Sequence, residues 1–365
     1  MSKNFQNERQ AEIMNSKERI MTILNHKRPD RIGRFDSFFK GFQEKCIKRL
    51  KLTNKSDLLE YFNIDMQIIR ADESPFPTKA KTISEDKNKK IILDGWGRTI
   101  EIHKGAFFHK ELKHAVNNRT DLDKLKFDKP SLDLRYGDFF SHEYTKNSKK
   151  CIFCKVGGPY QRTSFLQGEF NYLMDIAGDP GFIKELVAKV SDHIIEIGKE
   201  SLKRADLYDT GIWIADDMAS NDATMMSPKS FEEIYYPVWK KMIKSFKEAG
   251  ATKICMHGDG NLLSILDMLV DAGVDAINPV EPRAHMNLVA LKKKYGNRLA
   301  YIGGICNTNI LRKGTKREIE KSSREIIDVG KEGGVVIGTH SLSPDIPIEN
   351  YLFYDKIVKK YGNYE

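Results

Sequence analysis

Residues 248–280, EAGATKICMHGDGNLLSILDMLVDAGVDAINPV, contain two apolar segments and the amphipathic segment that joins them. The pattern predicts strands over Lys253–His257 and Ala276–Val280 and a helix over Leu262–Ala272. Gly273 directly follows the helix, where it suits the left-handed residue that often ends one. A strand, a helix and a second strand in this order are typical of a parallel βαβ unit.

The same alternation recurs along much of the chain. Eight apolar segments are expected to be strands: Ile32–Phe38, Met66–Ala71, Cys151–Val156, Gly211–Ala215, Lys253–His257, Ala276–Val280, Leu299–Ile305 and Val335–Thr339. Five amphipathic segments are expected to be helices: Pro228–Glu248, Leu262–Ala272, Leu288–Tyr295, Lys316–Lys331 and Ile348–Tyr361. Eight strands of this kind favour an α/β fold of the (β/α)8 TIM-barrel type. We expect residues 1–365 to form this one domain.

An N-terminal helical extension is expected within residues 1–30. Asn15 is a plausible helix cap, and Glu18 three residues later completes the pattern of a capping box. Apolar side chains then follow at helical spacing and predict a buried stripe at Ile20, Ile23 and Leu24.

Residues 72–150 do not follow the alternation, because they are rich in charge and poor in helix signals. Within them, Ile91–Asp94 and Arg98–His103 flank the sequence Gly-Trp-Gly, which predicts a β-hairpin. Loops of this length are usually functional or disordered. We expect an insertion, with the hairpin close to the barrel mouth and roofing it.

Composition excludes several classes of protein. Apolar residues make up 40% of the 365 positions and charged residues 30%, enough for a large core and unlike a disordered chain. The net charge of +9 is small for this length and spread along it, so no nucleic-acid partner is expected. The odd count of five cysteines favours a reducing compartment, the cytoplasm. No signal peptide or membrane-spanning apolar run is apparent.

Polar residues gather where the predicted strands end, which is where TIM barrels carry their chemistry. They are Asp36, Asp216, Asp217, His257, Asp259, Glu281, Cys306 and His340. His257 and Asp259 stand two apart on extended backbone and therefore point to the same side. Together with Glu281 and His340 they could bind zinc or another divalent ion. The same side chains could equally form a metal-free acid–base cluster. A lone histidine at a strand end is more often structural.

Three other patterns give weaker indications of function. Cys151 and Cys154 match the CxxC spacing, but strand residues three apart point to opposite faces, which favours a core role over a redox pair. One of Asp216 and Asp217 is better explained as a helix cap. Gly157 and Gly158 could admit a ligand or form a turn.

Several motifs, in order along nearly the whole chain, resemble the uroporphyrinogen decarboxylase superfamily. They are MTILNHKRPDR at 21–31, GGP at 157–159, QGE at 167–169, DDM at 216–218, MSP at 226–228, HGDG at 257–260 and PDIPIEN at 344–350. The resemblance implies a TIM barrel with its active site at the mouth.

The resemblance is closer to the corrinoid-dependent methyltransferases than to the haem-pathway decarboxylases. The decarboxylases carry an arginine-rich motif where this chain has Arg34-Phe-Asp-Ser-Phe-Phe-Lys40, so a substrate with eight carboxylates is not expected. The methyltransferases bind metal through His-x-Cys, a glutamate and a final cysteine. Their histidine and glutamate match His257 and Glu281, whereas their two cysteines fall on Asp259 and His340.

The resemblance implies transfer of a methyl group from a small O- or N-methylated donor to the cob(I)alamin of a separate corrinoid protein. The harder ligand set favours zinc as a Lewis acid over thiolate activation. In this scheme Asp216, Asp217 and Glu281 act on the substrate. Two alternatives remain open: a metal-free lyase of a small acid that uses His340 and Asp36, and a non-catalytic barrel that binds a corrinoid.

Overall fold

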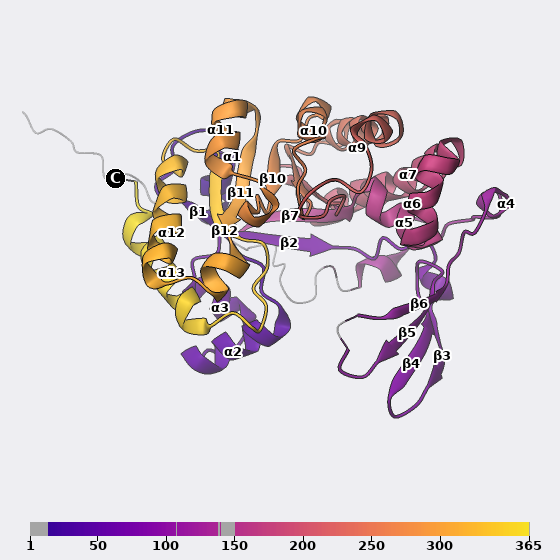
Figure 1. Ribbon diagram of the computed structural model, residues 1–365, viewed down its shortest axis with the longest axis horizontal. Coiled ribbons are helices and arrows are strands. Elements are labelled where there is room, and N and C mark those ends of the chain that lie inside the picture. Colours follow the sequence, from indigo (N-terminus) through magenta and orange to yellow (C-terminus); the bar gives the residue numbers. More distant parts are fainter. Residues whose placement is uncertain (1–13, 107, 138, 140–149, 365) are drawn as a thin grey trace, which may run out of the picture.

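The computed structural model describes residues 14–106, 108–137, 139 and 150–364. Among them, eight parallel strands form one sheet in the order β1-β12-β11-β10-β9-β8-β7-β2, which curves into a nearly closed barrel (Figure 1). The strands are β1 Gly33–Phe35, β2 Met66–Arg70, β7 Cys151–Gly157, β8 Gly211–Ala215, β9 Lys253–His257, β10 Ala276–Asn278, β11 Ala300–Ile305 and β12 Val335–Thr339. The (β/α)8 prediction is therefore confirmed.

Helices surround the barrel, and a second, smaller sheet extends from it. The helices are α1 Ser16–Leu24, α2 Lys40–Leu50, α3 Lys55–Tyr61, α4 Arg119–Leu122, α5 Pro159–Gln167, α6 Glu169–Gly178, α7 Pro180–Ala205, α8 Pro228–Ser230, α9 Tyr236–Glu248, α10 Leu266–Ala272, α11 Leu288–Tyr295, α12 Lys316–Gly330 and α13 Ile348–Tyr361. The antiparallel sheet contains β3 Lys81–Glu85, β4 Lys89–Leu93, β5 Thr99–His103 and β6 Lys110–Lys113. In Figure 1 the arrow of β2 points toward this sheet.

Helix α1 closes one end of the barrel. Its apolar side chains Ile20, Ile23 and Leu24 join the cluster that fills the barrel interior, together with Phe153, Trp213 and other inward-facing strand residues. The predicted capping box is present, because the Asn15 side chain accepts from Glu18 N at 3.0 Å and Asn15 N donates to the Glu18 carboxylate at 2.9 Å.

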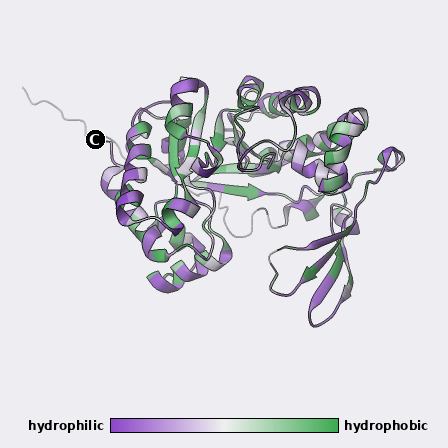
Figure 2. Cartoon of the chain, in the orientation of Figure 1, coloured by the Kyte–Doolittle hydropathy of each residue, from purple (hydrophilic) through white to green (hydrophobic). Residues whose placement is uncertain are grey.

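A second apolar layer lies between the strands and the helices. In Figure 2 hydrophobic colour concentrates on the barrel strands, and the surrounding helices carry both colours. Strand β7 shows the alternation: Cys151 belongs to the interior cluster and Cys154 to the outer layer. Both thiols are buried and free, as expected for core residues that point to opposite faces.

Strands β1 and β2 are the two edges of the sheet and are not paired with each other. Asp65 connects them. Its backbone N donates to Arg34 O at 2.8 Å, and its fully buried carboxylate accepts from Arg34 N at 2.9 Å. The same carboxylate accepts from Ser16 and Arg19 of α1 and from Arg31. One side chain therefore joins both edge strands and the closing helix.

The structure differs from the sequence-based prediction in two regions. The segment predicted as the helix Pro228–Glu248 contains α8, a π-helical turn at Phe231–Tyr235 and α9. The predicted hairpin is present as β4 and β5, but β3 and β6 extend it to a four-stranded sheet. Every residue of β3 is exposed, so it lacks the apolar alternation that would predict a strand. Within the described part of the chain, no helix combines the length and apolarity needed to cross a membrane.

Replacing Asp65 with Asn should lower the free energy of unfolding by about 3 kcal/mol, because Arg19, Arg31 and the β1 backbone lose a buried charged acceptor. Urea unfolding measures the change. The matched control is Asp209→Ala, which removes the exposed ion pair of Asp209 with Lys17 of α1 and should cost less than about 1 kcal/mol. Equal effects of the two changes would contradict the role assigned to Asp65.

Candidate metal centre

Three side chains meet at the carboxyl ends of the strands. His257 is the last residue of β9, Asp259 lies two residues further on, and His340 directly follows β12. One potential ligand atom from each lies within 4.8 Å of the other two. His340 Nε2 is 2.8 Å from Asp259 Oδ2, and His257 Nε2 is 3.6 Å from Asp259 Oδ1. The three ligand atoms are therefore close enough together to bind one ion.

Asn278 of β10 determines which nitrogen of His257 carries the proton. Asn278 Nδ2 donates to Ile302 O at 2.9 Å, which leaves its Oδ1 facing His257 Nδ1 at 2.6 Å. An amide oxygen only accepts, so Nδ1 must be the donor. The lone pair of neutral His257 is then on Nε2, the nitrogen that faces Asp259. This arrangement is common behind histidines that bind metals.

Asp259 has an oxygen without a hydrogen bond. Its Oδ1 is buried and has no hydrogen-bond partner among the described residues. Burial alone would raise the pKa of Asp259, but the hydrogen bond from His340 and the nearby imidazoles hold it below its ordinary value. Burial likewise opposes the charge on His340, yet Asp259 raises the pKa of that imidazole. A carboxylate that contacts two imidazole nitrogens and has one oxygen without a donor fits a cation.

The loop after β9 is positioned by a glycine and by Asp217. Gly260 has φ +89°, and a Cβ there would lie 2.5 Å or less from the backbone oxygens of Ala219 and Ser220. Asp217 Oδ1 accepts from Asp259 N at 3.1 Å and lies 3.9 Å from His257 Nε2. Its other oxygen accepts from Gln161 at 2.8 Å. Asp217 therefore lies at the edge of the three-residue group of His257, Asp259 and His340.

Asp216 is bonded to the start of α5 and not to the three-residue group. Its carboxylate, fully buried, accepts from the backbone N–H groups of Tyr160 at 3.1 Å and Gln161 at 2.7 Å. Burial raises the pKa of Asp216 to about 7, against the opposing effect of those two donors. Gly158 makes this approach possible, because a Cβ there would lie 2.2 Å from Asp216 Cβ. Of the two aspartates, Asp216 is thus the one that caps a helix.

The remaining predicted site residues lie outside the three-residue group. The negative charge of Glu281 helps to raise the pKa of His340, but its carboxylate is not among the three grouped ligand atoms. Asp36 is buried and accepts from Thr339 N at 3.0 Å, Tyr351 Oη at 2.9 Å and Arg34 at 3.2 Å. Arg34 is itself buried, so its guanidinium supports the fold.

Sequence reasoning did not single out Asn278 or Gln161, although both position site residues. Asn278 is the only polar residue of β10, and a lone amide in an apolar strand is the signal that could have identified it. Gln161 lies on a helix whose register against Asp217 is visible only in the fold.

Comparisons with known proteins identify the family of this chain. Residues 91–361 match the family described as "Uroporphyrinogen decarboxylase (URO-D)". The chain belongs to the uroporphyrinogen decarboxylase family. The resemblance seen in the sequence motifs is therefore confirmed, and the match includes β9, β12 and all three residues of the candidate centre.

Relatives within the uroporphyrinogen decarboxylase family carry methyltransferase names. The chain is 26% identical over 228 residues to the "Methylcobamide:CoM methyltransferase MtbA" of Methanosarcina mazei and 25% identical over 226 residues to that of Methanosarcina acetivorans. Each match covers 60% of this chain and 62% of the relative. A solved "methyltransferase from Methanosarcina mazei" has the same fold, with a TM-score of 0.64 at 15% identity over 95% of this chain and 99% of that chain.

Replacing Gly158 with Ala should lower the free energy of unfolding by about 2 kcal/mol, because the new methyl group would overlap the Asp216 side chain. Gly158 has φ −89°, so the cost comes from the overlap and not from backbone strain. Gly178→Ala is the matched control, since no heavy atom lies within 4 Å of a Cβ there, and it should be neutral or stabilising by up to about 1 kcal/mol. A neutral Gly158→Ala would show that Asp216 is not held against α5.

Proposed function

We propose that this protein transfers a methyl group between a small O- or N-methylated compound and the cobalt of a corrinoid protein, with a divalent ion, zinc, at His257, Asp259 and His340. The observation that carries the proposal is the Asp259 carboxylate at the barrel mouth, which contacts two imidazoles and has a buried oxygen, Oδ1, that no donor satisfies. Glu281 is a further candidate ligand, because its charge acts on His340.

The relatives support the class of reaction. Their printed name describes methyl transfer between a methylcobamide and CoM, and the matched segment spans 62% of their length. The ligand set of this chain supports the choice of substrate. Aspartate and histidine are harder ligands than the thiolates of the corrinoid-dependent methyltransferases it resembles, so they suit an oxygen or nitrogen substrate better than a thiol. Bound there, the ion would act as a Lewis acid on the heteroatom that loses the methyl group.

The protein's own residues have separate tasks in this scheme. Asn278 keeps the proton of His257 on Nδ1 and so presents Nε2 to the centre. Asp217 lies at the rim, 3.9 Å from His257 Nε2, where it can orient the substrate or accept a proton. Asp216 contributes indirectly, because it fixes the start of α5, on which Gln161 holds Asp217 in place.

The two alternatives predict different observations. A metal-free lyase would use Asp36 with His340, but Asp36 accepts hydrogen bonds from three buried donors, and no observation favours a free acid–base role for it. It would be active without metal. A non-catalytic barrel would bind corrinoid protein without turnover.

The experiment combines metal analysis with a methyl-transfer assay. The wild-type protein should contain about one divalent ion per chain, and the double variant His257→Ala/His340→Ala should retain almost none. Conversion of cob(I)alamin to methylcobalamin is then followed by absorbance, with O-, N- and S-methylated compounds as donors. Asp259→Ala should lower the rate at least about 100-fold with the best donor, since it removes a ligand.

His103→Ala is the matched control, because His103 is an exposed histidine of β5 and should change neither metal content nor rate. Methyl transfer that survives complete removal of metal would contradict the role proposed for the ion. Stoichiometric metal without turnover of any methylated compound would contradict the proposed reaction. Activity restricted to S-methylated donors would contradict the assignment of an oxygen or nitrogen substrate.

A further inference from the structure

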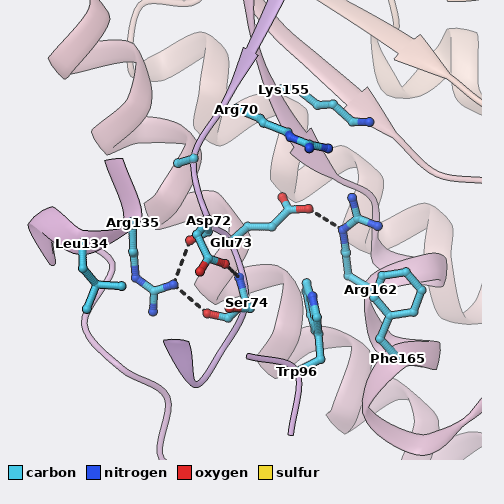
Figure 3. A pocket seen from close by; sticks show the side chains of 11 residues that line it. Arg70, Asp72, Glu73, Ser74, Trp96, Leu134, Arg135, Lys155, Arg162 and Phe165 are labelled. Atoms are coloured by element: carbon cyan, nitrogen blue, oxygen red, sulfur yellow. Dashed lines mark hydrogen bonds and ion pairs between the residues drawn. The ribbon is translucent and has the colours of Figure 1, made fainter. Parts of the chain in front are cut away.

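A cavity of about 530 Å³ opens at the carboxyl ends of β2 and β7, the same end of the barrel as the candidate centre. Figure 3 shows that its walls come from three parts of the fold. Arg70 and Lys155 belong to the barrel strands, Arg162 and Phe165 to α5, and Trp96 to the turn of the inserted sheet. Trp96 and Phe165 pack edge to face, with ring centroids 5.3 Å apart.

Two of the cations around this cavity are already used by the fold. Arg162 donates to Glu73 and, at 2.7 Å, to Gln161 Oε1. The second Glu73 oxygen accepts from Gly157 N at 2.6 Å, so Arg162 and the β7 backbone both hold this carboxylate in place. Arg135 donates to backbone carbonyls at four positions, two on the approach to the cavity, at Asp72 and Ser74, and two at Asp128 and Lys129.

The other two cations have no such partner. Arg70 and Lys155 are register partners on the neighbouring parallel strands β2 and β7, so their side chains leave the same face of the sheet. In Figure 3 both extend along the upper side of the cavity. Neither makes a hydrogen bond or ion pair with any residue that the structure describes. Like charges on adjacent strands destabilise a sheet unless something opposite lies between them.

The surroundings of Lys155 also disfavour its positive charge. Burial lowers its pKa, and the positive charges of Arg162 and Arg70 lower it further, against the opposing charges of Glu73 and Asp217. Lys155 is also close enough to the centre that its charge helps to lower the pKa of Asp259. An anion bound between Arg70 and Lys155 would relieve the repulsion and would lie at the same end of the barrel as the His257–Asp259–His340 group.

We propose that this cavity binds a small organic anion, whose carboxylate or sulfonate group contacts Arg70 and Lys155 and whose flat apolar body packs against Trp96 and Phe165. A guanidinium binds such planar or branched oxyanions through two parallel hydrogen bonds, and an aromatic wall accepts a flat body. The cavity volume lies within the range of small-molecule sites. The inference rests on the proposed function in one respect: it identifies the bound anion as the methylated compound.

The test is an equilibrium titration of the full-length protein with benzoate, benzenesulfonate and inorganic sulfate. Binding is followed by calorimetry and by tryptophan fluorescence. The chain has three tryptophans, and Trp213 and Trp239 are buried, so Trp96 is the one that should respond. Trp96→Phe should abolish the fluorescence change but retain binding in the calorimeter, because phenylalanine preserves an aromatic wall.

Arg70→Gln and Lys155→Gln should each raise the Kd of benzoate or benzenesulfonate about 10-fold or more. Arg70 is exposed, so its variant should fold normally. The matched control is Arg49→Gln, which removes an exposed arginine of α2 that pairs with Glu349 and should leave the Kd unchanged. Wild-type affinity in both cavity variants, no binding of either organic anion, or equal affinity for sulfate would overturn the proposal.

This titration requires no methyl donor, corrinoid or metal, so its outcome is independent of the methyl-transfer assay. Specific anion binding without methyl transfer would leave the cavity assignment standing and remove the proposed reaction. Methyl transfer with unchanged anion affinity in Arg70→Gln and Lys155→Gln would do the reverse.

Discussion

Closure of the parallel sheet is the constraint on which the candidate centre depends. His257 and His340 come from β9 and β12, which are separated by two strands in the sheet. They approach one carboxylate only because the sheet curves round, so that strand ends face one another across the mouth. The closing seam is not a regular ladder, and the Asp65 carboxylate connects β1, Arg31 and α1 there. A buried anion at the opposite end of the barrel from the site thus helps to fix the curvature that assembles it.

The polar groups at the barrel mouth are of two kinds: some are satisfied by hydrogen bonds that support the fold, and others remain free for a ligand. Asp216 and Asp36 lie at strand ends, but buried donors satisfy both. The Asp259 oxygen and the neighbouring Arg70–Lys155 pair are not satisfied in this way. A buried oxygen without a donor costs free energy, and Arg70 and Lys155 place two positive charges side by side, so a ligand of opposite charge would stabilise either site. The two sites have opposite charge and lie at the same end of the barrel, which suits a substrate that presents an anionic group to one and its reacting heteroatom to the other.

The sequence contains most of the information for the barrel and only part of the information for the site. Buried parallel strands are short apolar runs between amphipathic helices, so β8, β9 and β12 could be predicted to the residue. The predicted strand ends include His257, Asp259 and His340, so these three residues could be predicted as a group from the sequence. Strand β3 could not be predicted, because it is exposed throughout and has no apolar alternation. The Arg70–Lys155 pairing could not be predicted either, since it depends on the register of two strands far apart in sequence. Asp216 and Asp217 have different roles because they make different contacts with α5. Their adjacent positions in the sequence do not predict this difference.

The central claim is that His257, Asp259 and His340 bind one divalent ion. Anomalous X-ray diffraction from crystals of the full-length protein, recorded above and below the absorption edge of zinc, tests it most directly. The account predicts one strong edge-dependent peak bonded to His257 Nε2, His340 Nε2 and an Asp259 oxygen. A metal-loaded crystal with no peak among these three side chains, or with its peak elsewhere, would contradict it.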